Sequence, residues 1–379
     1  MNFERLNSGS ADKVPAMKDE DIKKKIEFEK VPAYMDAYKD AERFLNKNSV
    51  AINDKKFVDF YGQESIISDR EKLKSIKAER GEGLVEEEGK AIADLVEATI
   101  LHGLAESEWF GENIRATKTT EFDDNVEGVD IVAEVFDPKG AKESKFIALA
   151  VDATYANDLN KKIIRIGQEI RGVYKHKNDK ASRSPLASVK YYIDIKGNVK
   201  NIKSVPKVVA CCDIDTAENI GEKYWGRKDK CVGEVKDKKD LKDEQIKFQI
   251  LEEALIQLDY FGRYAAKQDV VWSIEASEKY QHLYKDLLTV YEKSSREVDA
   301  DGEPIIYKTR KMVKNPDGTL EKTSTGKPVV KEVSSYKLVD QGVRDKSFAQ
   351  LINELSGLDP TLDIRRPYDQ LQASVNQSI

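Results

Sequence analysis

The pattern of hydrophobic and polar positions between residues 84 and 214 predicts an ordered series of helices and strands. Segments 84–104 and 159–174 place apolar residues at the spacing of one helical face. Segments 123–137 and 146–155 have the pattern of strands, and the turn-forming sequence PKGAKES between them predicts a hairpin. Two further strands follow in SVKYYIDI and KVVACCDI, joined by a basic turn region, KGNVKNIKSVP. The order helix, strand, strand, helix, strand, strand indicates an α/β fold.

Charged helical patterns flank this core on both sides. The first 80 residues are dense in charge and predict helices, with Pro32 separating two of them. Helices resume at about residue 241, and an Asn-Pro-Asp-Gly turn between polar strands predicts a projecting hairpin. We therefore expect a helical charged N-terminal region at 1–80, an α/β core at 81–275, and a helical C-terminal region with the hairpin and a polar tail at 276–379.

Composition points to a water-exposed surface and away from a membrane. The 379 residues are 35% charged, compared with roughly 25% in an average domain. No apolar run reaches the roughly 20 residues that span a bilayer, and the N-terminal sequence MNFERLNSGSADK lacks the apolar segment of a secretory signal. Cys211, Cys212 and Cys231 lack the spacing of a zinc site or a disulfide framework. We expect a cytoplasmic protein without a membrane partner.

Charge is distributed unevenly along the chain. The net charge of the whole chain is -6, yet residues 171–207 contain ten Lys or Arg and two Asp, a local net charge of +8. A basic block of this kind attracts phosphates even on an acidic protein. The side chains that we expect to contact a nucleic-acid backbone are Lys175, Lys177, Lys180 and Arg183. The alternative is that these residues only solvate a hairpin and its loop.

Acidic residues interrupt the apolar faces of two predicted strands and one helix. Asp152 ends the apolar run FIALAVDATY, and burying an ionised carboxylate is costly unless it is paired or bound to a metal. If the two strands pair, Asp130 projects to the same side as Asp152. On the helix 84–104, Glu88 falls inside the apolar arc, whereas Asp94 and Glu97 are expected to point to solvent. Three carboxylates make an oxygen-rich site that suits Mg²⁺ or Mn²⁺.

This arrangement resembles the PD-(D/E)XK nuclease superfamily, whose members include many restriction endonucleases. That family's core has a helix with a glutamate, a strand with an aspartate, a strand carrying (D/E)-x-K, a second helix and a further strand. Here the corresponding positions are Glu88, Asp130 in EGVD and Asp152 in VDAT, and the resemblance covers roughly residues 84–216. Thr154 stands at the family's lysine position.

The resemblance implies a mixed central sheet flanked by helices and a metal-dependent nuclease that hydrolyses DNA phosphodiesters. Asp130, Asp152 and Glu88 would be the metal ligands and, together with Lys162, the catalytic residues. Lys162, on the next helix, would replace the missing lysine and position the attacking water, because some members supply it from there. Thr154 would lie behind the ligands and support them.

Several alternatives stay open at the level of sequence. Asp152 can cap the following helix, Asp130 can belong to a turn, and Glu88 and Lys162 can face solvent. The missing lysine favours a non-catalytic nucleic-acid-binding or protein-interaction module on the same fold, and the helical regions are candidate surfaces for a homodimer or a protein partner. Asp213-Ile214-Asp215 resembles the nucleophile motif of haloacid-dehalogenase-like phosphatases, but Ala217 stands where that motif has Thr or Val.

Overall fold

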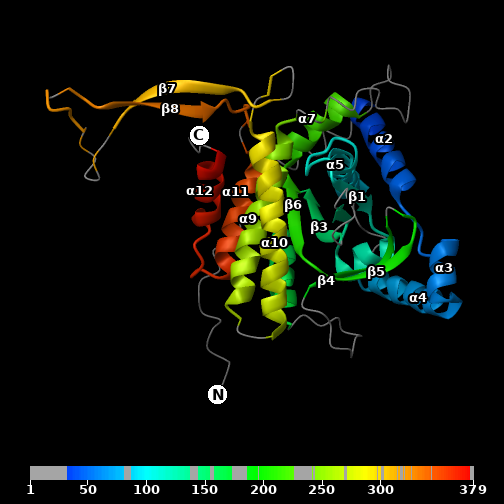
Figure 1. The fold of residues 1–379 in the computed structure, drawn as a ribbon. Coiled ribbons are helices and arrows are strands. Elements are labelled where there is room, and N and C mark those ends of the chain that lie inside the picture. The colour runs from blue at the N-terminus through cyan, green and yellow to red at the C-terminus, as the bar shows by residue number, and fades with distance from the viewer. Residues whose placement is uncertain are drawn as a thin grey trace, which may run out of the picture.

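The computed structural model describes most of the chain from Pro32 to Val375. The described residues are 32–80, 87–136, 144–153, 158–172, 186–194, 196–225, 241, 244–268, 271–296, 298–299, 303–313, 315, 319, 321–325, 327–342 and 344–375. They form a mixed α/β fold in which helices surround a small sheet (Figure 1). The predicted α/β class is therefore confirmed, while the three predicted region boundaries stay predictions.

The helices and strands follow one another in an order close to the predicted one. The helices are α2 (Pro32–Asn48), α3 (Lys55–Tyr61), α4 (Gln63–Arg80), α5 (Glu87–Ala105), a π-helix (Asp123–Glu127), α6 (Asp158–Ile170), α7 (Ile214–Tyr224), α9 (Ile246–Ala266), α10 (Val271–Ser294), α11 (Lys346–Leu358) and α12 (Arg365–Val375). The strands are β1 (Ile114–Lys118), β2 (Ile131–Val135), β3 (Lys145–Ala153), β4 (Ala187–Ile193), β5 (Val199–Val205), β6 (Lys207–Cys212), β7 (Ile306–Met312) and β8 (Val330–Tyr336).

The central sheet has the strand order β1-β2-β3-β6. The first three strands are antiparallel neighbours, and β6 runs parallel to β3. The predicted hairpin is confirmed, because Ile131 pairs with Leu149 and Ala133 with Ile147. A parallel pair needs a crossover, and α6 lies in the connection from β3 to β6 and packs against both strands.

Two features of the strands differ from the expectations. The sequence IRATK was not predicted as a strand, yet it forms β1, since five residues are too few to show a clear alternation. The turn region KGNVKNIKSVP is wrong as a turn, because most of it forms β5, which pairs with β4 in a separate two-stranded sheet. Ile202 and Val205 of β5 are buried against the face of β2 and β3 that carries Val132 and Ala148.

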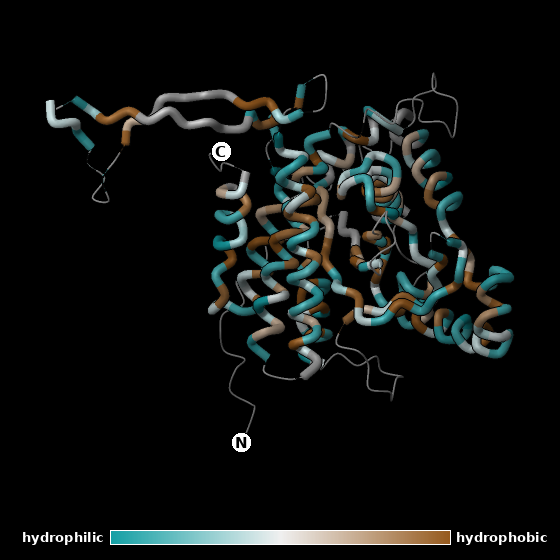
Figure 2. Tube along the Cα trace, in the orientation of Figure 1, coloured by the Kyte–Doolittle hydropathy of each residue, from teal (hydrophilic) through white to brown (hydrophobic). Residues whose placement is uncertain are grey.

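Helices cover both faces of the sheet and its β6 edge. Helix α5 packs against β1 and β3, and α2 in turn packs on α5. Helix α9 lies against β6 and pairs with α10 over its length. In Figure 2 hydrophilic and hydrophobic residues alternate along α10, as expected for a helix that buries part of its surface, whereas α9 is buried on nearly all sides. Among the described residues, no helix combines the length and the apolarity that crossing a bilayer requires.

The C-terminal part adds an extended ribbon and two helices. Strands β7 and β8 pair in antiparallel register, from Ile306 opposite Tyr336 to Met312 opposite Val330. This ribbon projects away from the helices, as the Asn-Pro-Asp-Gly turn predicts (Figure 1). Arg344, which follows the ribbon, donates two 2.7 Å hydrogen bonds to the carboxylate of Glu252 on α9. Because Glu252 is fully buried, this ion pair fixes the C-terminal segment to the central helices.

Candidate functional site

Asp130 stands directly before β2, between the ends of β1 and β3. Its backbone N–H donates to the carbonyl of Leu149 at 3.0 Å, and its own carbonyl accepts from the N–H of Thr119 at 3.0 Å. These two bonds continue the sheet pairing on both sides of residue 130. The predicted aspartate is therefore held at the rim of the central sheet, with its side chain partly buried.

A π-helix places a second aspartate, Asp124, beside Asp130. Asp123, the residue before it, is fully buried and accepts from the backbone N–H groups of Lys190 at 2.7 Å and Tyr191 at 3.1 Å. Gly128 ends the π-helix with φ 64°, a left-handed conformation that glycine adopts easily. Single π-helical turns often occur at functional sites, so Asp124 is a candidate functional residue.

Helix α5 and strand β1 contribute an ion pair next to the two aspartates. Glu97, in the middle of α5, pairs with Lys118, the last residue of β1. Their side chains are only 12% and 19% exposed, respectively. A largely buried pair of this kind is held firmly, and it brings the helix carboxylate to the end of the sheet where Asp130 lies.

The pKa values of Glu97, Asp124 and Lys118 are shifted by burial and by the charges around them. Burial raises the pKa of Glu97 to about 7, and Asp130 adds to the rise while Lys118 opposes it. Burial also raises the pKa of Asp124 well above its usual range, with further contributions from the charge and hydrogen bond of Asp130 and from Glu97. Burial lowers the pKa of Lys118, but the neighbouring carboxylates outweigh it and the net shift is upward. Glu97 and Asp124 therefore hold their protons more tightly than carboxyl groups in water do.

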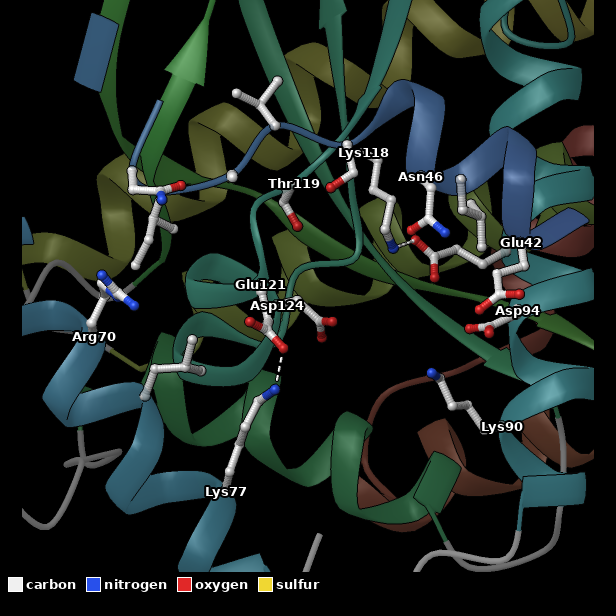
Figure 3. A pocket seen from close by; sticks show the side chains of 18 of the residues that line it. Glu42, Asn46, Arg70, Lys77, Lys90, Asp94, Lys118, Thr119, Glu121 and Asp124 are labelled. Carbon is white, nitrogen blue, oxygen red and sulfur yellow. Dashed lines mark hydrogen bonds and ion pairs between the residues drawn. The ribbon is translucent and has the colours of Figure 1, made fainter. Parts of the chain in front are cut away.

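Glu97, Lys118 and Asp124 line a cavity of about 570 Å³ (Figure 3), whereas Asp130 is not part of its lining. Its wall is formed by the end of α2 and the loop that follows it, by α4, α5 and the end of β1, and by the π-helix. The acidic residues that line it are Glu42, Asp94, Glu97, Glu121 and Asp124, and the basic ones are Arg70, Lys74, Lys77, Lys90 and Lys118. A cavity of this size is typical of a ligand site.

The structure accounts for the predicted site residues to different extents. Glu88 lies in the first turn of α5 and Asp152 in β3 opposite Cys211, but their side chains lie outside the described part of the chain. Lys162 is partly buried on α6. Thr154 and the four predicted backbone-binding residues Lys175, Lys177, Lys180 and Arg183 lie outside the described residues.

Other lysines of the predicted basic block form ion pairs within the protein. Lys190 pairs with Asp69, Lys200 with Asp194 at 2.9 Å, and Lys207 with Glu169 at 2.8 Å. Lys207 is only 2% exposed, and burial lowers its pKa. The positive charges of these three lysines are therefore paired with acidic side chains of the protein itself.

The expectation that Asp94 and Glu97 point to solvent is wrong, since both line the cavity. A helix with one buried face would expose both residues, but α5 contacts α2, α7, β1 and β3. From Leu95 to Leu104 it is buried nearly all round, and Glu97 is the one Asp, Glu, Lys or Arg in that stretch. A single charged residue within a run that is apolar on all sides of a helix is the signal that could have identified Glu97. No pattern in the sequence marked Asp124 or Lys118.

Within the described ranges, no group of three or more His, Cys, Asp or Glu is arranged to hold a metal ion. Comparison with known proteins adds no relative, because no family model, no curated protein and no solved structure matches the chain.

Proposed function

We propose that this protein is a metal-dependent nuclease that hydrolyses DNA phosphodiester bonds in the cavity between α4, α5 and the π-helix. The observation that carries the proposal is the convergence of Glu97, Asp124 and Asp130 around Lys118. The three carboxylates come from a helix, a π-helix and the residue directly before a strand. Burial, together with the charge of the neighbouring carboxylates, raises the pKa of Glu97 and of Asp124. Convergent carboxylates in a cavity are the usual protein part of a site for a divalent cation and a phosphate.

The order and direction of the elements support a PD-(D/E)XK-like core. Helix α5 precedes the antiparallel strands β1, β2 and β3, and α6 then leads to β6, which is parallel to β3. Extending the β2–β3 register by one residue sets Asp130 opposite Ala150, and Asp152 is the next residue of β3 on that face. This register agrees with the predicted pairing of Asp130 and Asp152 at one end of the sheet.

The donor chemistry of the cluster fits Mg²⁺ or Mn²⁺. Carboxylate oxygens are the ligands that these hard cations prefer, and Mg²⁺ needs only one or two of them because water and substrate phosphate fill the other positions. Asp130 and Asp124 would hold the ion, with Asp152 as the predicted third ligand. When bound, such an ion supplies an activated water and stabilises charge on the leaving oxygen.

The chain's own groups would orient the substrate and the water. Lys118 is fixed beside the carboxylates by Glu97, so its ammonium group can neutralise phosphate charge at the floor of the cavity. Lys162 on α6 stays our predicted group for positioning water, and Thr154 our predicted supporting residue. Two carboxylates of α5, Asp94 and Glu97, line the cavity, and Glu97 lies nine residues after the predicted Glu88.

Cleavage assays with a metal-binding control test the proposal. Supercoiled, linear and single-stranded DNA are incubated with the protein in Mg²⁺, Mn²⁺ or EDTA, and the same is done with Asp130→Asn and Asp124→Asn. We expect cleavage that requires the metal and is lost in both variants. Glu275→Gln, on the exposed side of α10, is the matched control and should cleave normally.

A second readout separates catalysis from binding. Mn²⁺ should raise the melting temperature of the wild type and not that of Asp130→Asn, because an ion that binds only the folded state stabilises it. DNA retention without cleavage in any metal would instead identify a non-catalytic nucleic-acid-binding module. If the protein neither cleaves nor binds DNA, a protein-interaction module is the better description.

A further inference from the structure

Helix α4 presents a row of basic side chains to the cavity. Arg70, Lys74 and Lys77 all line it, and their spacing of four and three residues keeps them within an arc of roughly 60° on one flank of the helix (Figure 3). The neighbouring flank of α4 is anchored in the protein, because Ile66 and Leu73 are buried in a hydrophobic cluster. The basic row is therefore held at a fixed place on the cavity wall.

Two of these cations have no hydrogen-bond or ion-pair partner among the described residues. Lys77 forms an ion pair with Glu121. By contrast, neither Arg70 nor Lys74 makes a hydrogen bond or ion pair to any described residue, and both side chains are exposed at the cavity mouth. The cavity thus has a positive wall on α4 opposite a floor with an excess of carboxylates. A ligand that matches it carries negative charge toward α4.

We infer that this basic row binds consecutive phosphates of a single nucleic-acid strand whose next phosphodiester reaches the carboxylates on the floor. The inference deepens the proposed function and rests on it for the choice of ligand. Arg70 and Lys74 are one helical turn apart, a rise of about 6 Å along α4, which is close to the separation of neighbouring phosphates in an extended strand. Arg and Lys are the side chains that proteins use to contact phosphates without reading sequence.

The size of the cavity favours one strand over a duplex. About 570 Å³ lies within the range of roughly 300–1,000 Å³ for sites that hold one small ligand, which suits a nucleotide and excludes the full width of a double helix. Intact duplex would contact only the mouth. The strand that enters is then either single-stranded DNA or RNA, or the overhang of a duplex end.

The test measures binding without cleavage. Fluorescence anisotropy in EDTA compares a labelled single-stranded DNA oligonucleotide, the same sequence as a blunt duplex, and a duplex with a single-stranded overhang. The variant Arg70→Gln/Lys74→Gln removes both unpartnered charges of the row. The control Lys55→Gln/Lys56→Gln removes two positive charges from exposed positions of α3 that do not line the cavity.

Loss of two phosphate contacts has a defined effect on salt dependence. Each contact to a single strand contributes about 0.7 to the slope of log affinity against log salt, so the double variant should lower that slope by about 1.4. Between 1 M and 0.1 M salt this corresponds to about 25-fold weaker binding of single-stranded DNA at the lower salt. The control variant should keep the wild-type slope to within about 0.3.

Three results would overturn the inference. One is an equal loss in both double variants, which would indicate a general charge effect. Another is an unchanged slope in Arg70→Gln/Lys74→Gln, and the third is blunt duplex that binds as tightly as the single strand and depends equally on the two residues. The proposed nuclease activity can fail separately. If binding depends on Arg70 and Lys74 but no metal-dependent cleavage is found, the phosphate-binding role of the basic row holds and the nuclease proposal is wrong.

Discussion

The side chain of Gln257 hydrogen-bonds the backbone of Val209 in both directions. Its Oε1 accepts from the N–H of Val209 at 2.8 Å, and its Nε2 donates to the carbonyl of the same residue at 2.6 Å. Four residues earlier on α9, Glu253 accepts from the N–H of Cys211 at 2.7 Å. The match arises because four residues of helix rise about 6 Å and two residues of strand about 6.6 Å. Helix α9 therefore closes the β6 edge of the central sheet.

Replacing Gln257 with leucine should destabilise the protein strongly. Gln257→Leu leaves the N–H and the carbonyl of Val209 buried without a partner, and each such group costs about 1–3 kcal/mol. We expect a loss of about 2–5 kcal/mol in the free energy of unfolding, measured by urea denaturation. Gln370→Leu, on the exposed surface of α12, should change it by less than about 0.5 kcal/mol. Similar stabilities for the two variants would show that the hydrogen bonds from α9 do not stabilise the β6 edge of the sheet.

Asp123 should be needed both for stability and for the position of Asp124. Its carboxylate joins the π-helix to the backbone of β4 and also accepts from the hydroxyl of Thr120 at 2.9 Å. Asp123→Ala leaves the partly buried N–H of Lys190 and the buried N–H of Tyr191 without their acceptor, so we expect a loss of about 3 kcal/mol in the free energy of unfolding. Chemical denaturation measures it, with the exposed Glu71→Ala of α4 as the control. A loss below about 1 kcal/mol would contradict this role.

The sequence predicted the parts of the fold in which hydrophobic periodicity has a single meaning. The hairpin of β2 and β3 and helix α6 follow directly from alternation and helical spacing. Strand β1 is too short for its pattern to be seen, and β5 has three exposed residues among seven, so its polar sequence looked like a turn. Both segments form strands because they pair with neighbouring strands, which their local sequence does not show.

Of the residues in the proposed site, Asp130 was predicted from the sequence, whereas Glu97 and Asp124 were not. The strand pattern is enough to identify Asp130, because the linear sequence shows an aspartate next to an apolar run. Glu97 depends on which sides of α5 are covered, and α2 covers a side that a single-face helix would leave to solvent. Asp124 depends on a π-helix that Asp123 fixes to β4, a contact between residues 67 positions apart. Such long-range contacts have no signature in local sequence.

Glu97 and the predicted Glu88 can be separated by metal affinity. Both lie on α5, but Glu97 lines the cavity and interacts with Asp130, so it should support cation binding. We expect Glu97→Gln to weaken Mn²⁺ binding by about 10–100-fold, the usual effect of losing a group next to a metal, and Glu88→Gln to change it by less than about threefold. Isothermal titration with Mn²⁺ gives both constants. If Glu88→Gln weakens Mn²⁺ binding more than Glu97→Gln does, the carboxylate of α5 that supports the metal is Glu88.

The raised pKa values of the cluster predict how stability and metal binding depend on pH. The pKa of Glu97 rises from 4.5 to about 7 on folding, mainly through burial, so the folded state holds its proton more tightly than the unfolded state. Its contribution to stability is then fully present below about pH 4.5 and is lost as pH rises to about 7. The raised pKa of Asp124 acts in the same direction.

A divalent cation should reverse that trend, because it binds the deprotonated carboxylates and competes with protons. We expect saturating Mn²⁺ to raise the melting temperature more at pH 8 than at pH 6, while the metal-free protein melts at a higher temperature at pH 6 than at pH 8. Scanning calorimetry at both pH values, with and without Mn²⁺, measures the difference. Asp124→Asn should reduce the pH dependence of the metal effect. A metal effect that is equal at pH 6 and pH 8 would mean that these carboxylates do not bind the ion.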